Sequence, residues 1–240
     1  MALSHSPRIV TDGLVLCLDA ANTKSYGGSG STWTDIIGSY NGTISGATHT
    51  SGADGYFTFD GSNDYVDSGN LGSGFNDYTV IAWFYPTSVT DHENVLDCNY
   101  STNGSTGNLG PRLEMNSSGG LSWVYSNSSS NSNYYGHTVK SSGLSASTWH
   151  CAAITYTSSP GNTSVTYYNG SPTGLSRSTV GSPSGQYTTF NDLNIGRGFH
   201  LGGGERYYTG RVGAVQIYNK LLTAAEVKQN FDALRGRYGI

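Results

Sequence analysis

Hydrophobic and polar positions alternate with a period of two over short stretches of this chain, and turn-forming residues separate the stretches. Alternation of this kind indicates half-buried β-strands, and the intervening Gly, Ser, Asn and Pro residues indicate turns. Residues 79–85 (TVIAWFY) are apolar on both faces, which predicts a central strand covered from both sides. Many short strands at regular spacing are typical of an all-β sandwich or barrel. The predicted strands cover residues 13–18, 56–59, 78–85, 94–97, 111–115, 120–125, 149–156, 163–168, 192–195 and 207–217.

One segment near the end has the period of a helix instead. Thr223 and Glu226 have the spacing of a capping box, which predicts a helix over residues 223–236. We expect Gly236 to end it in the left-handed conformation. A helix this short needs tertiary contacts, so we expect its apolar face to dock on the sandwich. That face comprises Val227, Phe231 and Leu234.

The composition agrees with a globular, strand-rich protein. Gly provides 34 of 240 residues and charged residues only 12%, while 35% hydrophobic and 12% aromatic residues argue against disorder. No linker, charge block or repeat divides the chain. We therefore predict one domain over residues 13–240, preceded by an arm over residues 1–12. We expect the arm to dock on its own sandwich or on a neighbouring subunit.

Charge and hydropathy exclude several classes of protein. A net charge of −4 with 12 Lys and Arg residues provides no basic face for nucleic acid. No apolar run approaches the roughly 18 residues that a membrane helix requires. Residues 1–10 (MALSHSPRIV) lack the pattern of a secretory signal, so we do not expect export by that route. Cys17, Cys98 and Cys151 lie in apolar stretches and are predicted to be buried thiols, with one disulfide plus a spare thiol as the alternative.

Three segments together resemble a known family. They are GLVLCLDAANTKSY with TWTDIIGSYNGTI, then YFTFDGSNDYVDSG with DYTVIAWFYP, and finally YTGRVGAVQIYNKLLTAAEVKQNFDALRGRYG. Their order and spacing resemble laminin-G-like, or concanavalin-A-like, jelly-roll domains. The resemblance implies two antiparallel sheets of six or seven strands each, packed as a sandwich. The start SPRIVTDGLVL also resembles single-domain structural proteins of tailed phages, cyanophages in particular. The fold alone implies no function.

The sequence offers little support for an enzyme. Glycoside hydrolysis needs two opposed carboxylates, which sandwich glucanases supply from a Glu-x-Asp-x-x-Glu strand. None of the four Glu residues belongs to such a motif. Glu93 and Asp97 form the best remaining pair, and we interpret them as turn or surface residues. We therefore predict a non-enzymatic protein.

One acidic turn is a candidate metal site. Asp60, Asn63 and Asp64, with Asp67 beyond them, could provide oxygen ligands for Ca²⁺. The alternative is a turn in which these side chains accept hydrogen bonds from their own backbone. We predict no required cofactor and Ca²⁺ as the one candidate.

Two groups of residues are candidates for binding a glycan or a protein partner. In both groups aromatic rings stand beside polar side chains, as in sugar sites, although alternating aromatics on strands are ordinarily core residues. The first group is Trp123, Tyr125, Asn127, Tyr134, Tyr135 and His137, and the second centres on Arg197, His200 and Arg206.

We interpret the chain as a virion structural protein of a tailed phage, either a capsid decoration subunit or a tail or fibre domain. It would be located in the virion, form a homo-oligomer in the assembly, contact capsid or tail subunits and adhere to host surface polysaccharide. A carbohydrate-binding lectin, with or without Ca²⁺, is the alternative, and a glycosidase is third.

Overall fold

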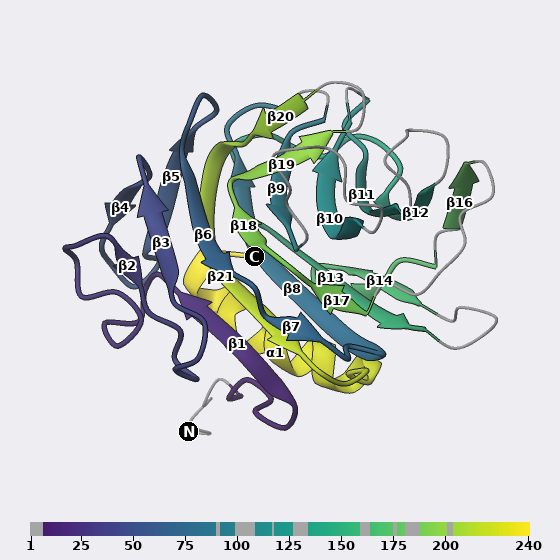
Figure 1. Ribbon diagram of the computed structural model, residues 1–240, viewed down its shortest axis with the longest axis horizontal. Coiled ribbons are helices and arrows are strands. Elements are labelled where there is room, and N and C mark those ends of the chain that lie inside the picture. The colour runs from purple at the N-terminus through teal and green to yellow at the C-terminus, as the bar shows by residue number, and fades with distance from the viewer. Residues whose placement is uncertain are drawn as a thin grey trace.

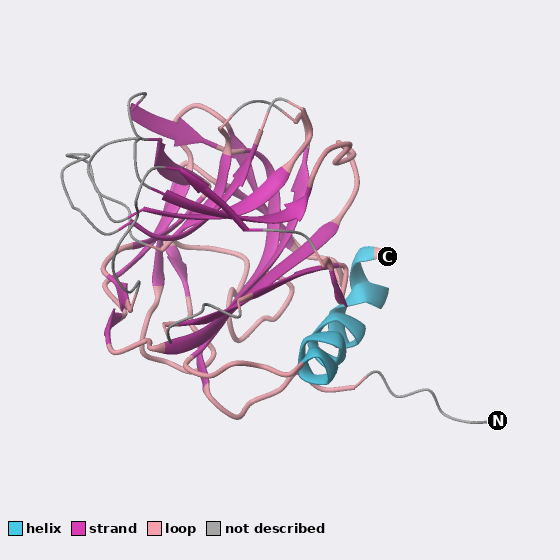
Figure 2. Ribbon diagram, turned by 90° about the vertical axis from the view of Figure 1, so that its right-hand side faces the viewer, coloured by secondary structure: helices cyan, strands magenta, loops and turns pink. Residues whose placement is uncertain are grey.

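Two antiparallel β-sheets pack face to face, and one helix covers the outside of one of them (Figures 1 and 2). This confirms the predicted all-β jelly-roll sandwich. The computed structural model describes residues 7–89, 92–98, 109–116, 118–126, 134–158, 164–174, 177–180, 188–200 and 204–240.

The first sheet has eight strands in the described residues. They are β1 (Leu14–Asp19), β4 (Thr48–Thr50), β5 (Tyr56–Asp60), β8 (Asp77–Pro86), β13 (His150–Thr157), β14 (Val165–Tyr168), β15 (Ser171–Pro172) and β21 (Thr209–Tyr218). Their order is β15–β14–β13–β8–β21–β5–β4, with β1 also paired to β21.

The second sheet has nine strands in the described residues. They are β2 (Thr32–Trp33), β3 (Gly42–Ser45), β6 (Tyr65–Gly69), β9 (Asn94–Asp97), β10 (Leu109–Met115), β11 (Leu121–Ser126), β12 (Tyr134–Lys140), β16 (Arg177–Val180) and β18 (Leu193–Ile195). Their order is β16–β12–β11–β10–β9–β18–β6–β3–β2. Two small pairs complete the fold: β7 (Gly72–Ser73) with β17 (Thr189–Phe190), and β19 (Arg197–His200) with β20 (Gly204–Tyr207).

Strand β8 is the centre of the first sheet, between β13 and β21, as the doubly apolar sequence predicts. Val80 and Phe84 belong to the core between the two sheets. Ile81 and Trp83 point the other way, into a second apolar cluster beneath the helix. The alternation therefore supplies side chains to two separate cores.

The helix α1 (Ala224–Tyr238) begins as predicted but ends later. Thr223 and Glu226 form the capping box, whereas the left-handed cap is Gly239, with φ 71°, and not Gly236. The reason lies in Tyr238, whose ring centroid is 4.3 Å from that of Trp149. Burying this ring offsets the cost of about 1 kcal/mol for a glycine inside the helix.

The segment before β1 docks on α1 through a closed set of hydrogen bonds. Asn230 Oδ1 accepts from the Val10 amide at 2.7 Å, and Asn230 Nδ2 donates to the Tyr218 hydroxyl at 2.9 Å. That hydroxyl donates in turn to the Val10 carbonyl at 3.0 Å. Arg8 and Val10 thus bind the chain's own helix, and residues 1–6 of the predicted arm lie outside the described residues. The division at residues 12 and 13 stays a prediction.

The predicted strands coincide within a few residues with β1, β5, β8, β9, β10, β11, β13, β14, β18 and β21. The expectation of six or seven strands per sheet was wrong, because short outer strands such as β2, β4, β15 and β16 extend both sheets. Cys17, Cys98 and Cys151 are buried and free, as predicted. Within the described residues, no helix combines the length and apolar character that crossing a bilayer requires.

Candidate functional site

The first group of predicted binding residues lies mainly inside the sandwich. Trp123 and Tyr125 are fully buried, and the Tyr125 ring stacks on that of Tyr156 with centroids 5.0 Å apart. His137 is buried beside them, and burial together with the Arg177 charge lowers its pKa to about 4. Of the two interpretations of these aromatics, the structure supports core packing over an exposed sugar platform.

Two further members of that group, Tyr134 and Tyr135, lie on opposite faces of β12. Tyr135 packs at the edge of the core, where the Arg177 guanidinium lies 4.4 Å from its ring centroid. Tyr134 precedes it on β12 and therefore points to the opposite face of the sheet. Asn127 lies outside the described residues. Tyr134 therefore does not share a face of the sheet with Trp123.

The second group lies on a hairpin that folds onto the outer face of the nine-stranded sheet (Figure 1). Arg112 Nη1 donates to the Phe199 carbonyl at 2.7 Å, and the Phe199 amide donates to Asp97 Oδ2 at 3.2 Å. A glycine is needed at position 198, because a Cβ there would lie 2.7 Å from Asn94 Cγ. Strands β19 and β20 are thereby fixed over β9 and β10.

The two other residues of this group, His200 and Arg206, have fewer described side-chain contacts. The Arg206 Nε is buried and has no hydrogen-bond partner in the described residues. The backbone of His200 pairs with Gly204, while its side chain lies outside the described part of the structure.

Beneath the hairpin, a row of polar residues crosses four strands. The register aligns Asp67 on β6 with Asn194 on β18, Asn194 with Asp97 on β9, and Asp97 with Arg112 on β10. Asn194, Asp97 and Arg112 are buried by the hairpin above them. Only Asp67, at the end of this row, keeps substantial exposure, with 38% of its side chain accessible.

Arg197 organises the exposed end of the row. Its Nε donates to Asn194 Oδ1 at 2.8 Å, and its Nη2 lies 3.9 Å from Asp67 Oδ2. Its guanidinium also covers the Tyr65 ring, 3.4 Å from the centroid. Asn194 Nδ2 in turn donates to Asp192 Oδ1 at 3.1 Å. We call this set, formed by Tyr65, Asp67, Asp192, Asn194 and Arg197, the Asp67–Arg197 cluster.

Two carboxyl groups in the cluster, those of Asp67 and Asp192, influence each other's protonation. The pKa of Asp192 is raised to about 6, first by partial burial and then by the charge of Asp67 and a hydrogen bond to it, while Arg197 and Asn194 oppose the rise. At the rim, the Tyr207 hydroxyl donates to Glu205 Oε2 at 2.7 Å. The cluster therefore combines acceptors, amide and guanidinium donors, and aromatic surface within one partly exposed region.

The sequence did not single out Asp192, Asn194 or Tyr65. Asp192 and Asn194 are two residues apart, so period-two alternation could have placed them on one face. The pairing of β18 with β6, which brings them to Asp67, links residues more than a hundred positions apart. No local pattern in the chain specifies that pairing.

The carboxylates considered for catalysis have structural contacts. Glu93 and Asp97 are buried rather than at a turn or surface, which corrects the expectation for both. Glu93 accepts hydrogen bonds from the Thr209 amide at 3.3 Å and from its hydroxyl at 3.1 Å. Asp97 holds the β19–β20 hairpin through Phe199, as described above.

The acidic turn between β5 and β6 orders its own backbone. Asp60 Oδ1 accepts from the amides of Ser62 at 2.8 Å and Asn63 at 3.3 Å. Asp64 Oδ2 accepts from the Asp60 amide at 3.0 Å. Among the described residues, no group of three or more His, Cys, Asp and Glu side chains is placed to hold a metal ion. Calcium binding at this turn stays a prediction.

The comparisons with known proteins agree with this architecture. The family model described as the concanavalin A-like lectin/glucanases superfamily matches residues 60–228. No curated protein sequence matches the chain.

Solved structures share the fold at low sequence identity. A Trypanosoma rangeli sialidase in complex with 2,3-difluorosialic acid has a TM-score of 0.67 and 16% identity, over 95% of this chain and 34% of the sialidase. Domain 4 of an extracellular arabinanase from Geobacillus stearothermophilus, in complex with arabinotriose, has a TM-score of 0.63 and 14% identity, over 90% and 97%. The receptor binding domain of botulinum neurotoxin type G has a TM-score of 0.61 and 15% identity, over 92% and 51%.

This chain spans only about a third of the sialidase, so that likeness concerns the fold and not the activity. The family match covers more than half of the chain and includes β6, β18 and the β19–β20 hairpin, which form the cluster. With its two-sheet sandwich and this match, the chain belongs to the concanavalin A-like lectin/glucanases superfamily.

Proposed function

We propose that this protein binds carbohydrate, without hydrolysing it, through the Asp67–Arg197 cluster on the outer face of the nine-stranded sheet. The observation that carries the proposal is the joint placement of Asp67, Asp192 and Arg197 at the partly exposed end of a polar row. Sugar hydroxyl groups both donate and accept hydrogen bonds. A site with carboxylate acceptors beside a fixed guanidinium donor satisfies both needs.

The fixed geometry of the cluster also favours binding. Arg197 is held by Asn194 and by the Tyr65 ring, so its donors are positioned before any ligand arrives. Such preorganisation reduces the entropy lost on binding. The arabinanase domain of similar fold is in complex with arabinotriose, which supports a saccharide as the ligand class.

The spacing of the carboxyl groups supports binding rather than hydrolysis. Asp67 lies close enough to Asp192 to raise the pKa of that carboxyl through its charge and a hydrogen bond. Glycosidases separate their two carboxyl groups by about 5–5.5 Å in retaining enzymes and by about 6.5–9.5 Å in inverting ones. The close approach that this pKa shift indicates is shorter than either spacing, which favours binding.

A glycan array followed by calorimetry with the best polysaccharide tests the proposal. We expect Asp67→Asn and Arg197→Met each to weaken binding by about tenfold or more, because each removes a hydrogen bond to a charged group. Asp232→Asn on α1 is the matched control, since it alters a carboxylate on the opposite side of the sandwich. Absence of binding to any glycan, or equal affinity in all variants, would contradict the proposal. Repeating the array with a chelator tests the predicted Ca²⁺ dependence.

The finer role of a phage virion component stays a prediction, together with its capsid or tail partners, its oligomerisation and its location in the virion. Removal of residues 1–10 tests it. The role predicts loss of attachment to the particle with an intact sandwich, whereas full attachment of the truncated chain would count against it. Because Val10 is bound by Asn230, a truncation of residues 1–6 is the milder companion variant.

A further inference from the structure

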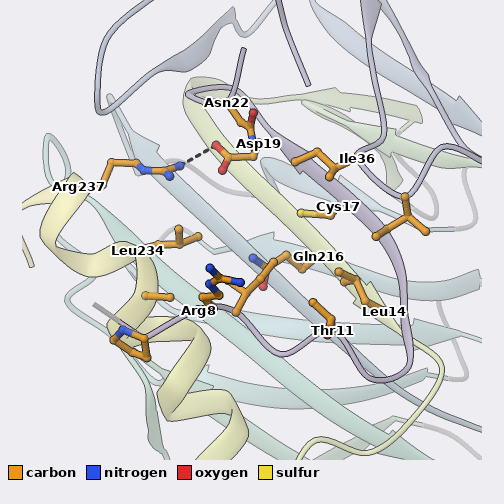
Figure 3. Close-up of a pocket in the computed structure, with 14 residues that line it drawn as sticks. Arg8, Thr11, Leu14, Cys17, Asp19, Asn22, Ile36, Gln216, Leu234 and Arg237 are labelled. Atoms are coloured by element: carbon orange, nitrogen blue, oxygen red, sulfur yellow. Dashed lines mark hydrogen bonds and ion pairs between the residues drawn. The ribbon is translucent and has the colours of Figure 1, made fainter. Parts of the chain in front are cut away.

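A pocket lies on the side of the molecule opposite the Asp67–Arg197 cluster. It opens between α1, the segment before β1, and the β1–β21 pair, where the helix leaves the eight-stranded sheet uncovered (Figure 3). Its volume is about 560 Å³. This is within the range of roughly 300–1,000 Å³ that is usual for sites of small organic ligands.

Much of the wall of this pocket is apolar. Leu14 and Leu234 line it from β1 and α1. Ile36 and Ile37 contribute from the loop after β2, and their exposed fractions are 38% and 46%. These two neighbours are among the few large hydrophobic side chains that the described residues leave exposed. An apolar ligand in the pocket would cover part of their surface.

The floor of the pocket holds a buried amide whose oxygen has no hydrogen-bond partner in the described residues. Gln216 lies on β21 between Val215 and Ile217, which both face the core, so its side chain points outward into the pocket. It is only 1% exposed, and its Oε1 has no hydrogen-bond partner in the described residues. A buried amide without a partner costs about 1–3 kcal/mol. The position therefore favours a ligand with a polar group at the floor.

The pocket also contains a positive charge. Arg8 lines the same pocket, and Figure 3 shows its side chain directed toward Gln216. The other arginine of the pocket, Arg237, is already paired with Asp19, with 2.6 Å between Nη1 and Oδ1. Arg8 forms no ion pair with any described residue, so the pocket has one unneutralised cation. The Cys17 thiol beside Gln216 is neutral, because burial raises its pKa to about 12.

We propose that this pocket binds a medium-chain carboxylic acid. The carboxylate accepts hydrogen bonds from Arg8 and from Gln216 Nε2, which takes the place of the unpartnered Oε1 when the side-chain amide rotates by 180°. The hydrocarbon chain lies against Leu14, Ile36 and Leu234. This site is independent of the proposed carbohydrate site, since the core and both sheets separate them.

Calorimetric titration of the full chain with decanoate at neutral pH, below its micelle concentration, tests the proposal. We expect saturable binding, weakened about tenfold in Gln216→Leu, because a hydrogen bond to a charged group is lost. Ile37→Ser should weaken it as well, and Val165→Ser, at an exposed apolar residue elsewhere, is the matched control. Decan-1-ol should bind less tightly than decanoate, because it lacks the charge that Arg8 attracts.

A second measurement separates binding from folding. Gln216→Leu removes an unpartnered buried amide, so it should leave the free energy of unfolding equal or higher while decanoate affinity falls. Equal decanoate affinity in wild type and Gln216→Leu would overturn the proposal. So would a wild-type dimer that Ile37→Ser dissociates, because a second copy would then be the occupant of the pocket.

Discussion

Asp35 is the residue whose replacement tests the structural reasoning most directly. It lies in the loop after β2 and is 1% exposed. Its Oδ1 accepts hydrogen bonds from the amides of Cys17 at 2.8 Å and Ile37 at 3.1 Å. Its Oδ2 accepts from the amides of Ser39 at 3.2 Å and Tyr40 at 3.3 Å. One carboxylate therefore joins β1 to a whole loop.

The substitution Asp35→Asn keeps the shape of the side chain but leaves only one of its two oxygens to accept hydrogen bonds. One of the two oxygens becomes an NH₂ group, which meets two backbone amides that are themselves donors. Hydrogen bonds to a charged group contribute a net of about 1.5–3 kcal/mol each. The amide group should replace the oxygen that accepts the two longer hydrogen bonds, because these contribute least. Losing these two of the four hydrogen bonds should lower the free energy of unfolding by about 3–4 kcal/mol.

Urea unfolding followed by tryptophan fluorescence measures this loss. Asp12→Asn is the matched control, because Asp12 is 83% exposed and its pair with Lys220, with 2.7 Å between Oδ2 and Nζ, lies at the surface. Surface pairs contribute about 0–1 kcal/mol, so this variant should unfold almost like the wild type. A loss below about 1 kcal/mol in Asp35→Asn would refute the assignment of its four hydrogen bonds.

Three further predictions concern titration and the helix. The pKa of Asp192 in the folded state is raised to about 6, so its contribution to stability is present below pH 3.8 and lost as the pH rises to about 6. The loss should be about 1 kcal/mol after allowance for solvent screening, and urea midpoints across this range should vary less in Asp67→Asn. Gly236→Ala should raise the free energy of unfolding by about 0.5–1 kcal/mol, because the helix continues through an open position there. Gly239→Ala should lower it by about 1 kcal/mol, because that residue is left-handed, and equal effects of the two substitutions would contradict the observed helix end. Phe231→Ala should cost about 3–4 kcal/mol in thermal or urea unfolding through the loss of a buried ring, and a loss under 1 kcal/mol would show that the helix is not docked as described.

The elements that could be predicted are those whose local pattern is strong. Residues 79–85 are apolar throughout because β8 separates two cores, and Thr223 with Glu226 marks the helix start through its own hydrogen bonds. Alternation along β11 also located a strand correctly. It could not tell which face was inward, so Trp123 and Tyr125 could equally be core residues or surface residues.

The candidate site was predictable only in part, because it depends on pairing between distant strands. Arg197 was selected from its surroundings of aromatic and glycine residues. Its partners Asp67 and Asn194 come from β6 and β18, which meet through the sheet register alone. The end of α1 was missed for a related reason. Gly236 looks like a stop locally, but the contact of Tyr238 with Trp149 extends the helix beyond it.

The position of α1 also determines how the molecule can be attached to something else. Pro7 lies in the segment that docks on α1, and Ile240 follows the last turn of that helix (Figure 2). Both positions are on the side of the eight-stranded sheet. A tether, tag or solid support joined at either position would therefore leave the opposite sheet face turned toward the solution. If the protein is coupled to a sensor surface through either position, the Asp67–Arg197 cluster faces the dissolved glycans. The pocket between α1 and the β1–β21 pair then lies near the support.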